Sequence, residues 1–251
     1  VLRQDENQDQ LKESAKLKLY KNGVRGLFQL LKEILFPRVC AACGSEIDSG
    51  LFCAACRKAQ RCLKTLPAED PLDGVLFLFS YEGEVRRAFR KIKFSGNRQL
   101  PGMLAEEAEA LWETPEMLWA LRLLRAGDNL VPPSLWCGVP TDPERLRKRG
   151  FDLPTLLFAN RAAATGGRWQ TLLCRTRCSS PMYGLTPEER RRNLLNCFAA
   201  VSDVRGKSIV LTDDIFTTGA TFTAAARVLK QAGAKRVQGL AFCGAAENLM
   251  K

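Results

Sequence analysis

The spacing of apolar residues along the chain predicts strands and helices in alternation. Short apolar runs bounded by turn residues favour buried strands at 74–81, 135–139, 197–201, 209–212 and 236–243. Apolar residues at helical spacing favour helices at 24–35, 83–93, 101–125, 152–163 and 222–231, the third of them interrupted by Pro115. Because strands and helices alternate after residue 67, the pattern predicts an α/β domain with a mostly parallel sheet flanked by helices.

The same pattern divides the chain into three parts. Residues 1–36 form a polar N-terminal tail and one helix, which packs either on the rest of the protein or on a membrane or partner. Residues 37–66 form a small cysteine-rich unit, and residues 67–251 form the α/β domain. We find no run of 18 apolar residues and no apolar signal-peptide core, so we expect a cytoplasmic protein without a transmembrane helix.

Composition narrows the chemistry that is available to the chain. None of the 251 residues is histidine, which excludes Ser-His-Asp and Cys-His mechanisms and every metal site with a histidine ligand. Proton transfer must therefore use carboxylates, lysine, tyrosine, the substrate or water. The formal net charge of +11 predicts an anionic partner, either a polyphosphate ligand or a nucleic acid, although a uniformly solvated basic surface would give the same charge.

Four cysteines form two CxxC pairs separated by nine residues: Cys40, Cys43, Cys53 and Cys56. Each pair supplies two thiolates, and four thiolates complete the tetrahedral shell of a structural Zn²⁺ ion. A unit of about 30 residues around one zinc is too small to fold without its metal. We therefore predict a zinc ribbon at 37–66, with no ligand role for Cys62.

The segment 209–221 carries the most informative chemistry. Its apolar run ends in Asp213 and Asp214, which can accept hydrogen bonds from sugar hydroxyls or hold a hydrated Mg²⁺ ion. A loop of small and hydroxyl-bearing residues follows: Thr217, Thr218, Gly219, Ala220 and Thr221. Because this loop leads into a helix, its backbone N–H groups and hydroxyls can bind a phosphate. The order predicts a receptor for a ribose 5-phosphate; a buried strand with a polar turn and no ligand is the alternative.

These thirteen residues resemble the 5-phosphoribosyl-1-diphosphate (PRPP) signature of the type I phosphoribosyltransferases. The resemblance implies that Asp213 and Asp214 bind the ribose hydroxyls and are the catalytic residues. It also implies that residues 217–221 hold the 5-phosphate and that Mg²⁺ binds together with PRPP.

Three arginines fit the same ligand, because a guanidinium matches phosphate oxygens in a bidentate manner. Arg147 and Arg149 follow the strand at 135–139 and would clamp the departing pyrophosphate. Arg190 lies in the segment 175–193, which would form a mobile hood over the substrate. An exposed basic helix face and an ordinary solvated loop are the alternatives for these two regions.

The order of the motifs along the chain resembles the ComF family. The four-cysteine ribbon is followed by Val139-Pro140, by Arg147-Lys148-Arg149-Gly150-Phe151, by Leu185, Arg190 and Asn193, and by the PRPP signature. The family joins a zinc ribbon to a phosphoribosyltransferase-like domain, and its best-known members are needed for DNA uptake in natural competence. This chain departs from the family pattern at Asp152-Leu153, Met182 and Cys243-Gly244, so PRPP binding is the firmer expectation and catalysis stays open.

Two classes of function follow. In the first, the protein is an enzyme, a phosphoribosyltransferase that displaces pyrophosphate from PRPP with a nitrogen acceptor. In the second, it is a non-catalytic module whose ribbon and basic surface bind single-stranded DNA or a helicase partner, with PRPP or a nucleotide as regulatory ligand. The chain has no Walker A motif that would indicate an ATP-driven motor.

Overall fold

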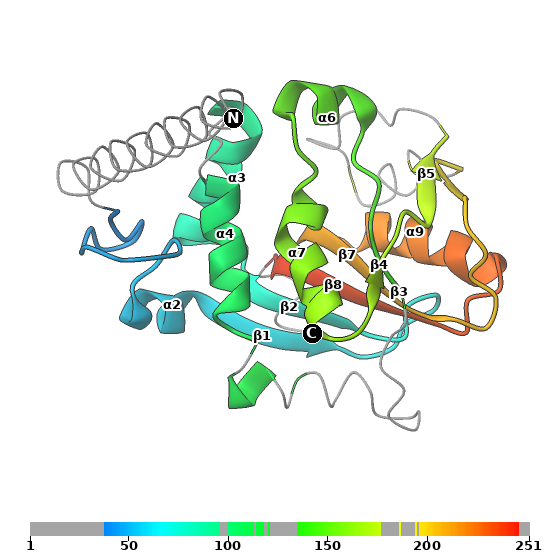
Figure 1. Ribbon diagram of the computed structural model, residues 1–251, viewed down its shortest axis with the longest axis horizontal. Helices are drawn as coiled ribbons and strands as arrows, with labels where there is room; N and C mark the ends of the chain where they lie inside the picture. Colours follow the sequence, from blue (N-terminus) through cyan, green and yellow to red (C-terminus); the bar gives the residue numbers. More distant parts are fainter. Residues whose placement is uncertain are drawn as a thin grey trace, which may run out of the picture.

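The computed structural model describes residues 38–95, 100–112, 114–117, 120, 135–176, 186, 194 and 196–245. The helix expected at 24–35 and the candidate ligand Arg190 lie outside the described residues. Figure 1 shows a central sheet with helices packed against it.

A six-stranded sheet forms the centre of the fold, in the order β1-β2-β8-β7-β3-β4. The strands are β1 (Arg61–Leu66), β2 (Val75–Ser80), β3 (Leu135–Gly138), β4 (Arg168–Trp169), β7 (Ser208–Phe216) and β8 (Arg236–Gly244). Every neighbouring pair is parallel except β1 and β2. The prediction of an α/β domain with a mostly parallel sheet is therefore confirmed.

Alternate residues of the strands pack into two hydrophobic clusters, one on each face of the sheet. Val210 of β7 belongs to the cluster that includes residues of α3 (Gly83–Ser95), α4 (Leu100–Glu109) and α7 (Leu153–Ala164). Ile209 and Leu211 belong to the cluster that includes α9 (Ala220–Gln231). Helices α4 and α7 contact each other and lie side by side in Figure 1. Because these strands are buried on both faces, they are near-continuous apolar runs in the sequence.

A second sheet of two strands lies outside the central sheet. Strand β5 (Leu173–Arg175) pairs antiparallel with β6 (Phe198–Ala200), and the pairing sets Arg175 directly opposite Phe198. The strand expected at 197–201 is present as β6, but it does not join the central sheet. Strand β5 was not predicted, because three residues are too few to show a period.

The cysteine unit runs directly into the central sheet. Helix α2 (Ala54–Gln60) is followed at once by β1, which pairs antiparallel with β2. Residues 61–66, which the sequence pattern assigned to the ribbon, therefore form an edge strand of the sheet. Their sequence did not indicate a strand because Arg61 and Lys64 interrupt the apolar run that marks a strand buried on both faces.

Candidate functional site

The carboxyl end of β7 carries the candidate acids. Asp213 and Asp214 are both half-buried, and the backbone N–H of Asp214 donates to Oδ1 of Asp213 over 2.8 Å. Strand β3 runs parallel to β7, with Gly138 in register with Thr212. The N–H of Val139 donates to the carbonyl oxygen of Thr212 over 2.8 Å. The loop that leaves β3 therefore starts beside the residue that precedes Asp213, at the sheet edge where parallel α/β folds bind ligands.

Gly219 connects the strand of the acids to helix α9. It has a φ of +76°, in the left-handed region, and it is the N-cap of α9, which begins at Ala220, two residues before the predicted start. A Cβ added at Gly219 would meet Cζ of Phe216 at 2.7 Å. Both the backbone conformation and the Phe216 ring therefore favour glycine at this position.

The predicted phosphate-binding residues lie in one turn around this glycine. Thr217 and Thr218 are exposed in the loop, and Ala220 and Thr221 form the first turn of α9. The first N–H groups of a helix have no partner within the helix, and the helix dipole places partial positive charge there. The first turn of α9 contains no acidic residue that would compete for those groups. The turn is thus suited to an anion.

The loop after β3 leads into α6 (Pro143–Arg149), which carries two of the predicted arginines. Asp142 is the N-cap of α6, and its Oδ1 accepts hydrogen bonds from two backbone N–H groups of the first turn over 3.0 and 3.3 Å. Arg147 is exposed, whereas Arg149 is half-buried with its Cζ 5.8 Å from the ring centroid of Phe151. The structure therefore places both arginines on the helix that follows β3, the strand beside that of the acids.

Asp152 ties this loop to helix α7. Its Oδ1 accepts a hydrogen bond from the Thr141 hydroxyl over 2.6 Å, and its Oδ2 accepts from the Thr155 hydroxyl over 2.5 Å and from the Thr155 N–H over 3.1 Å. Asp152 therefore caps α7 and holds Thr141 in place.

Sequence reasoning missed Arg175, which reaches the same loop from β5. Its Nε donates to the carbonyl oxygen of Pro140 over 2.8 Å, and its Cζ lies 5.1 Å from the ring centroid of Phe198. Burial lowers the pKa of Arg175, while the negative charges of Asp142 and Asp213 oppose that shift. The one signal in the sequence was its position at the start of the arginine-rich segment 175–193.

The four predicted metal ligands converge. The Sγ atoms of Cys40, Cys43, Cys53 and Cys56 all lie within 4.8 Å of one another. A tetrahedral shell with Zn–S bonds of about 2.3 Å has sulfur atoms about 3.8 Å apart, and the sulfurs of Cys43 and Cys53 are separated by 3.8 Å. Burial opposes ionisation of Cys40, but hydrogen bonds from the backbone N–H groups of Cys53, Cys43 and Ala42 outweigh it and lower the pKa of the thiol to about 6. The cluster could therefore bind a metal ion such as zinc.

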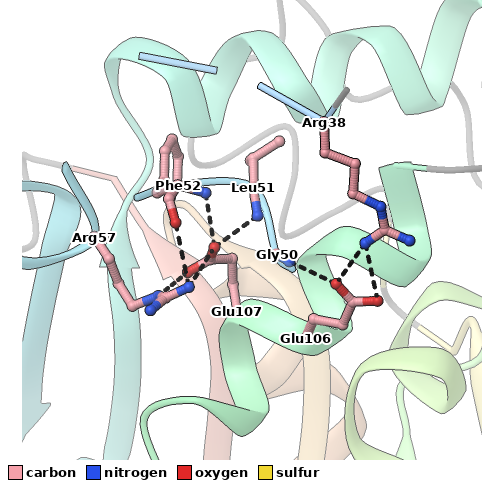
Figure 2. Close-up of polar contacts among 7 residues, drawn as sticks. All are labelled: Arg38, Gly50, Leu51, Phe52, Arg57, Glu106 and Glu107. Carbon is pink, nitrogen blue, oxygen red and sulfur yellow. Dashed lines mark hydrogen bonds and ion pairs between the residues drawn. The ribbon is translucent and has the colours of Figure 1, made fainter. Parts of the chain in front are cut away.

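A buried carboxylate of α4 docks the cysteine unit onto the α/β domain (Figure 2). The side chain of Glu107 is 0% exposed and accepts hydrogen bonds from the N–H groups of Leu51 and Phe52 over 2.6 and 2.7 Å. Nε of Arg57 donates to the same carboxylate over 2.6 Å, and this hydrogen bond raises the pKa of Arg57. Sequence gave no sign of this role, because Glu107 lies in a helix with several other glutamates.

Glu106 adds a second contact from the preceding position of α4. Its carboxylate accepts from the N–H of Gly50 over 2.5 Å and from Nη1 of Arg38 over 3.1 Å (Figure 2). Gly50 has a φ of +77°, and a Cβ there would collide with Oε1 of Glu107. Glycine at this position therefore allows the cysteine unit to approach α4 closely.

Comparison with known proteins finds a matching domain family and similar proteins. The family model described as the phosphoribosyl transferase domain matches residues 180–250, which include β7, the 217–221 turn and α9. The chain is 26% identical over 231 residues to the DNA utilization protein YhgH of Escherichia coli, which covers 82% of this chain and 97% of that protein. It is 25% identical over 214 residues to Competence protein F of Haemophilus influenzae, which covers 80% of this chain and 87% of that protein. The chain is a homologue of YhgH and Competence protein F. The resemblance to the ComF family is thereby confirmed, with the four-cysteine cluster in place.

Among solved structures, the phosphoribosylpyrophosphate synthetase of Mycobacterium smegmatis is similar to this chain. The identity is 18%, the match covers 66% of this chain and 53% of that chain, and the TM-score is 0.31. Within the part of the chain that the structure describes, none of the helices has the length and apolar character needed to cross a membrane.

Proposed function

We propose that this protein binds PRPP at the carboxyl ends of β3 and β7. One arrangement carries the proposal: Asp213 and Asp214 lie near the carboxyl end of β7, which a short turn connects to the glycine-capped helix α9, and the N–H of Val139 in the loop leaving β3 donates to the carbonyl oxygen of Thr212. Hydroxyl-binding acids and a phosphate-binding turn are the two features that a ribose 5-phosphate requires. The phosphoribosyl transferase family model supports the proposal, because its matched residues include both features.

In this proposal each part of PRPP has its own partner. Asp213 and Asp214 accept hydrogen bonds from the ribose hydroxyls, and the N–H groups and hydroxyls of residues 217–221 hold the 5-phosphate. The diphosphate contacts three arginines: Arg147, Arg149 and Arg190. Carboxylate and phosphate oxygens are the ligands that Mg²⁺ prefers, so the two acids and the diphosphate suit a bound Mg²⁺ ion.

The same site suits transfer of the phosphoribosyl group. A nitrogen nucleophile attacks C1 of the ribose, and the C1–N bond forms as the C1–O bond to the diphosphate breaks. Pyrophosphate leaves with the bonding electron pair, and the proton of the nucleophile passes to pyrophosphate, to water or to a carboxylate, since the chain has no histidine to receive it. The carboxylates of Asp213 and Asp214 stabilise the positive charge that develops on the ribose ring.

The cysteine cluster has a structural role in this proposal. Four thiolates at these separations suit one Zn²⁺ ion in a closed tetrahedral shell, with no open position for a substrate. The ion would stabilise the loop that presents Leu51 and Phe52 to Glu107.

A second candidate function is a binding module for single-stranded DNA or a helicase partner, with PRPP or a nucleotide as regulatory ligand. The names of the homologues point to DNA utilization and competence. The exposed side of α3 favours a nucleic-acid-binding surface. It carries four exposed basic side chains: Arg86, Arg87, Arg90 and Lys91. Residues three and four apart are neighbours on a helix, so these charges form one continuous patch that suits a phosphate backbone.

Calorimetry and a product assay test the two candidates. The zinc-loaded protein is titrated with PRPP in the presence and absence of Mg²⁺, and pyrophosphate release is then measured with a panel of nitrogen bases. PRPP binding with pyrophosphate release supports the transferase. PRPP binding without release across the panel supports the binding module, and no PRPP binding contradicts the proposed site.

A further inference from the structure

Arg175 is a rigidly held cation that the sequence motifs do not include. Its backbone is fixed by the pairing of β5 with β6, where it lies in register with Phe198. Its guanidinium group lies over the Phe198 ring, with Cζ 5.1 Å from the centroid, and its Nε donates to the Pro140 carbonyl over 2.8 Å. A side chain held in this way loses little conformational freedom when a ligand arrives.

Charged groups of the candidate site act on Arg175. Asp142 and Asp213 attract its charge, and Arg145 repels it. A guanidinium group remains protonated in proteins even where it is partly buried, so Arg175 brings a permanent positive charge to this edge of the sheet. From β5, its side chain is hydrogen-bonded to the loop after β3, and its charge interacts with that of Asp213 on β7.

We propose that Arg175 binds the diphosphate of PRPP, an inference that rests on the proposed function of this site. Pro140, which Arg175 holds, begins the loop that leads to the arginines of α6. Arg175 is therefore hydrogen-bonded to the loop assigned to the diphosphate, and its charge also interacts with that of Asp213, which is assigned to the ribose. Its planar set of N–H donors matches phosphate oxygens, which a single ammonium group does not.

Loss of Arg175 would have one effect on ligand binding if the residue only supports the loop, and another if it contacts the diphosphate. If it only held Pro140, its loss would act through the loop that leads to Arg147 and Arg149, and adding Arg147→Gln to Arg175→Gln would then weaken PRPP binding little further. If it contacts the diphosphate, its loss must weaken ligands that carry the diphosphate and spare ribose 5-phosphate, which lacks it. The choice of ligand shows whether Arg175 acts on the diphosphate, and the double variant with Arg147→Gln separates direct contact from support of the loop, because independent contacts weaken binding additively.

The experiment is a calorimetric titration of the full chain with PRPP, inorganic pyrophosphate and ribose 5-phosphate, each with Mg²⁺. Arg175→Gln should lower the affinity for PRPP and pyrophosphate about tenfold or more, and the affinity for ribose 5-phosphate less than about threefold. Arg175→Lys should retain more affinity than Arg175→Gln, because it keeps the charge. Arg205→Gln is the matched control, since Arg205 is an exposed arginine before the amino end of β7.

Each outcome decides the question. Equal weakening of all three ligands, no weakening, or no further loss when Arg147→Gln is added to Arg175→Gln contradicts direct contact by Arg175 while leaving the proposed PRPP site intact. No binding of PRPP by the wild type contradicts the proposed function and this inference together. If thermal unfolding shows that Arg175→Gln does not fold, the same comparison of three ligands is made with Arg175→Lys.

Discussion

Glu107 and Arg57 lie 50 positions apart in the sequence and form an ion pair of 2.6 Å in which the carboxylate is fully buried. The same carboxylate accepts hydrogen bonds from the N–H groups of Leu51 and Phe52, the two residues before Cys53. A buried carboxylate costs free energy unless it is paired and hydrogen-bonded, and its partners among the residues that the structure describes come from the cysteine unit. The folding of that unit is therefore coupled to the stability of α4.

Glu107→Gln should lower the free energy of unfolding by about 3–5 kcal/mol, because it removes one partner of a buried ion pair. Glu109→Gln is the control, since Glu109 is exposed on the same helix, and it should change stability by less than about 0.5 kcal/mol. Urea unfolding followed by circular dichroism measures both variants. Equal unfolding midpoints for the two variants would show that the buried pair contributes little.

Loss of metal should destabilise the whole domain. The protein purified without chelators should contain about one zinc per chain. Removal of the zinc should lower the melting midpoint of the protein, because Leu51 and Phe52, which lie between the cysteine pairs, belong to the hydrophobic cluster of α3 and α4. Elemental analysis and thermal unfolding provide the two measurements. Cys53→Ser should reproduce the effect, and Cys62→Ser should not, because Cys62 lies outside the cluster. A metal-free protein with an unchanged melting midpoint would contradict this coupling.

Asp213→Asn and Asp214→Asn should each weaken PRPP binding by about tenfold or more, because each replaces a charged hydrogen-bond acceptor with a neutral one of similar shape. Asp203→Asn should leave the affinity unchanged, since Asp203 is exposed before the amino end of β7 and pairs with Arg205. Isothermal titration calorimetry is the measurement. Wild-type affinity in both substituted proteins would rule out the proposed ribose contacts.

Gly219→Ala should destabilise the protein more than Gly206→Ala. Both glycines have positive φ, +76° and +67°, so alanine costs about 1 kcal/mol of backbone free energy at either position. Only at Gly219 would the new Cβ also meet the ring of Phe216, whereas nothing lies within 4 Å at Gly206. The difference in unfolding free energy between the variants isolates that contact, and equal losses would show that the ring moves aside.

Single-stranded DNA binding by the basic patch of α3 should depend steeply on salt. The affinity should fall strongly between about 50 and 500 mM salt, because phosphate neutralisation releases bound counterions. Replacing Arg86 and Arg90 together with glutamine should weaken binding and flatten the salt dependence, whereas Arg205→Gln should do neither. Fluorescence anisotropy at several salt concentrations measures the affinity for single-stranded DNA and its dependence on salt. Undetectable binding at about 50 mM, or binding that survives unchanged at about 500 mM, contradicts a role for this surface.

The parts of the fold that the sequence predicts are those whose signal is local. The strand at 209–212 is an apolar run because both faces of β7 are covered, and the CxxC spacing brings two sulfurs together within a few residues. The turn at Gly219 is also local, although the structure adds Phe216 as a reason for the glycine. Such features do not depend on how distant segments meet.

The parts that the sequence could not predict depend on distant partners. Glu107 and the exposed Glu109 lie in the same helix, and only contact with residues of the cysteine unit distinguishes them. Arg175 is one of several arginines in its segment until β5 pairs with β6 and directs it to Pro140. In both cases the decisive contact joins residues more than 30 positions apart, where no periodicity can reveal it.

Strand β1 follows α2 of the cysteine unit without a linker, so a truncation after residue 66 does not separate the cysteine unit from an intact α/β domain. A chain that began at residue 67 would lose the strand that covers β2, leaving the N–H and C=O groups that now pair with β1 open along an apolar edge. An exposed apolar edge is a template for strand pairing between molecules. The shortened protein would aggregate, and a loss of activity measured on it would report insolubility instead of the contribution of the ribbon.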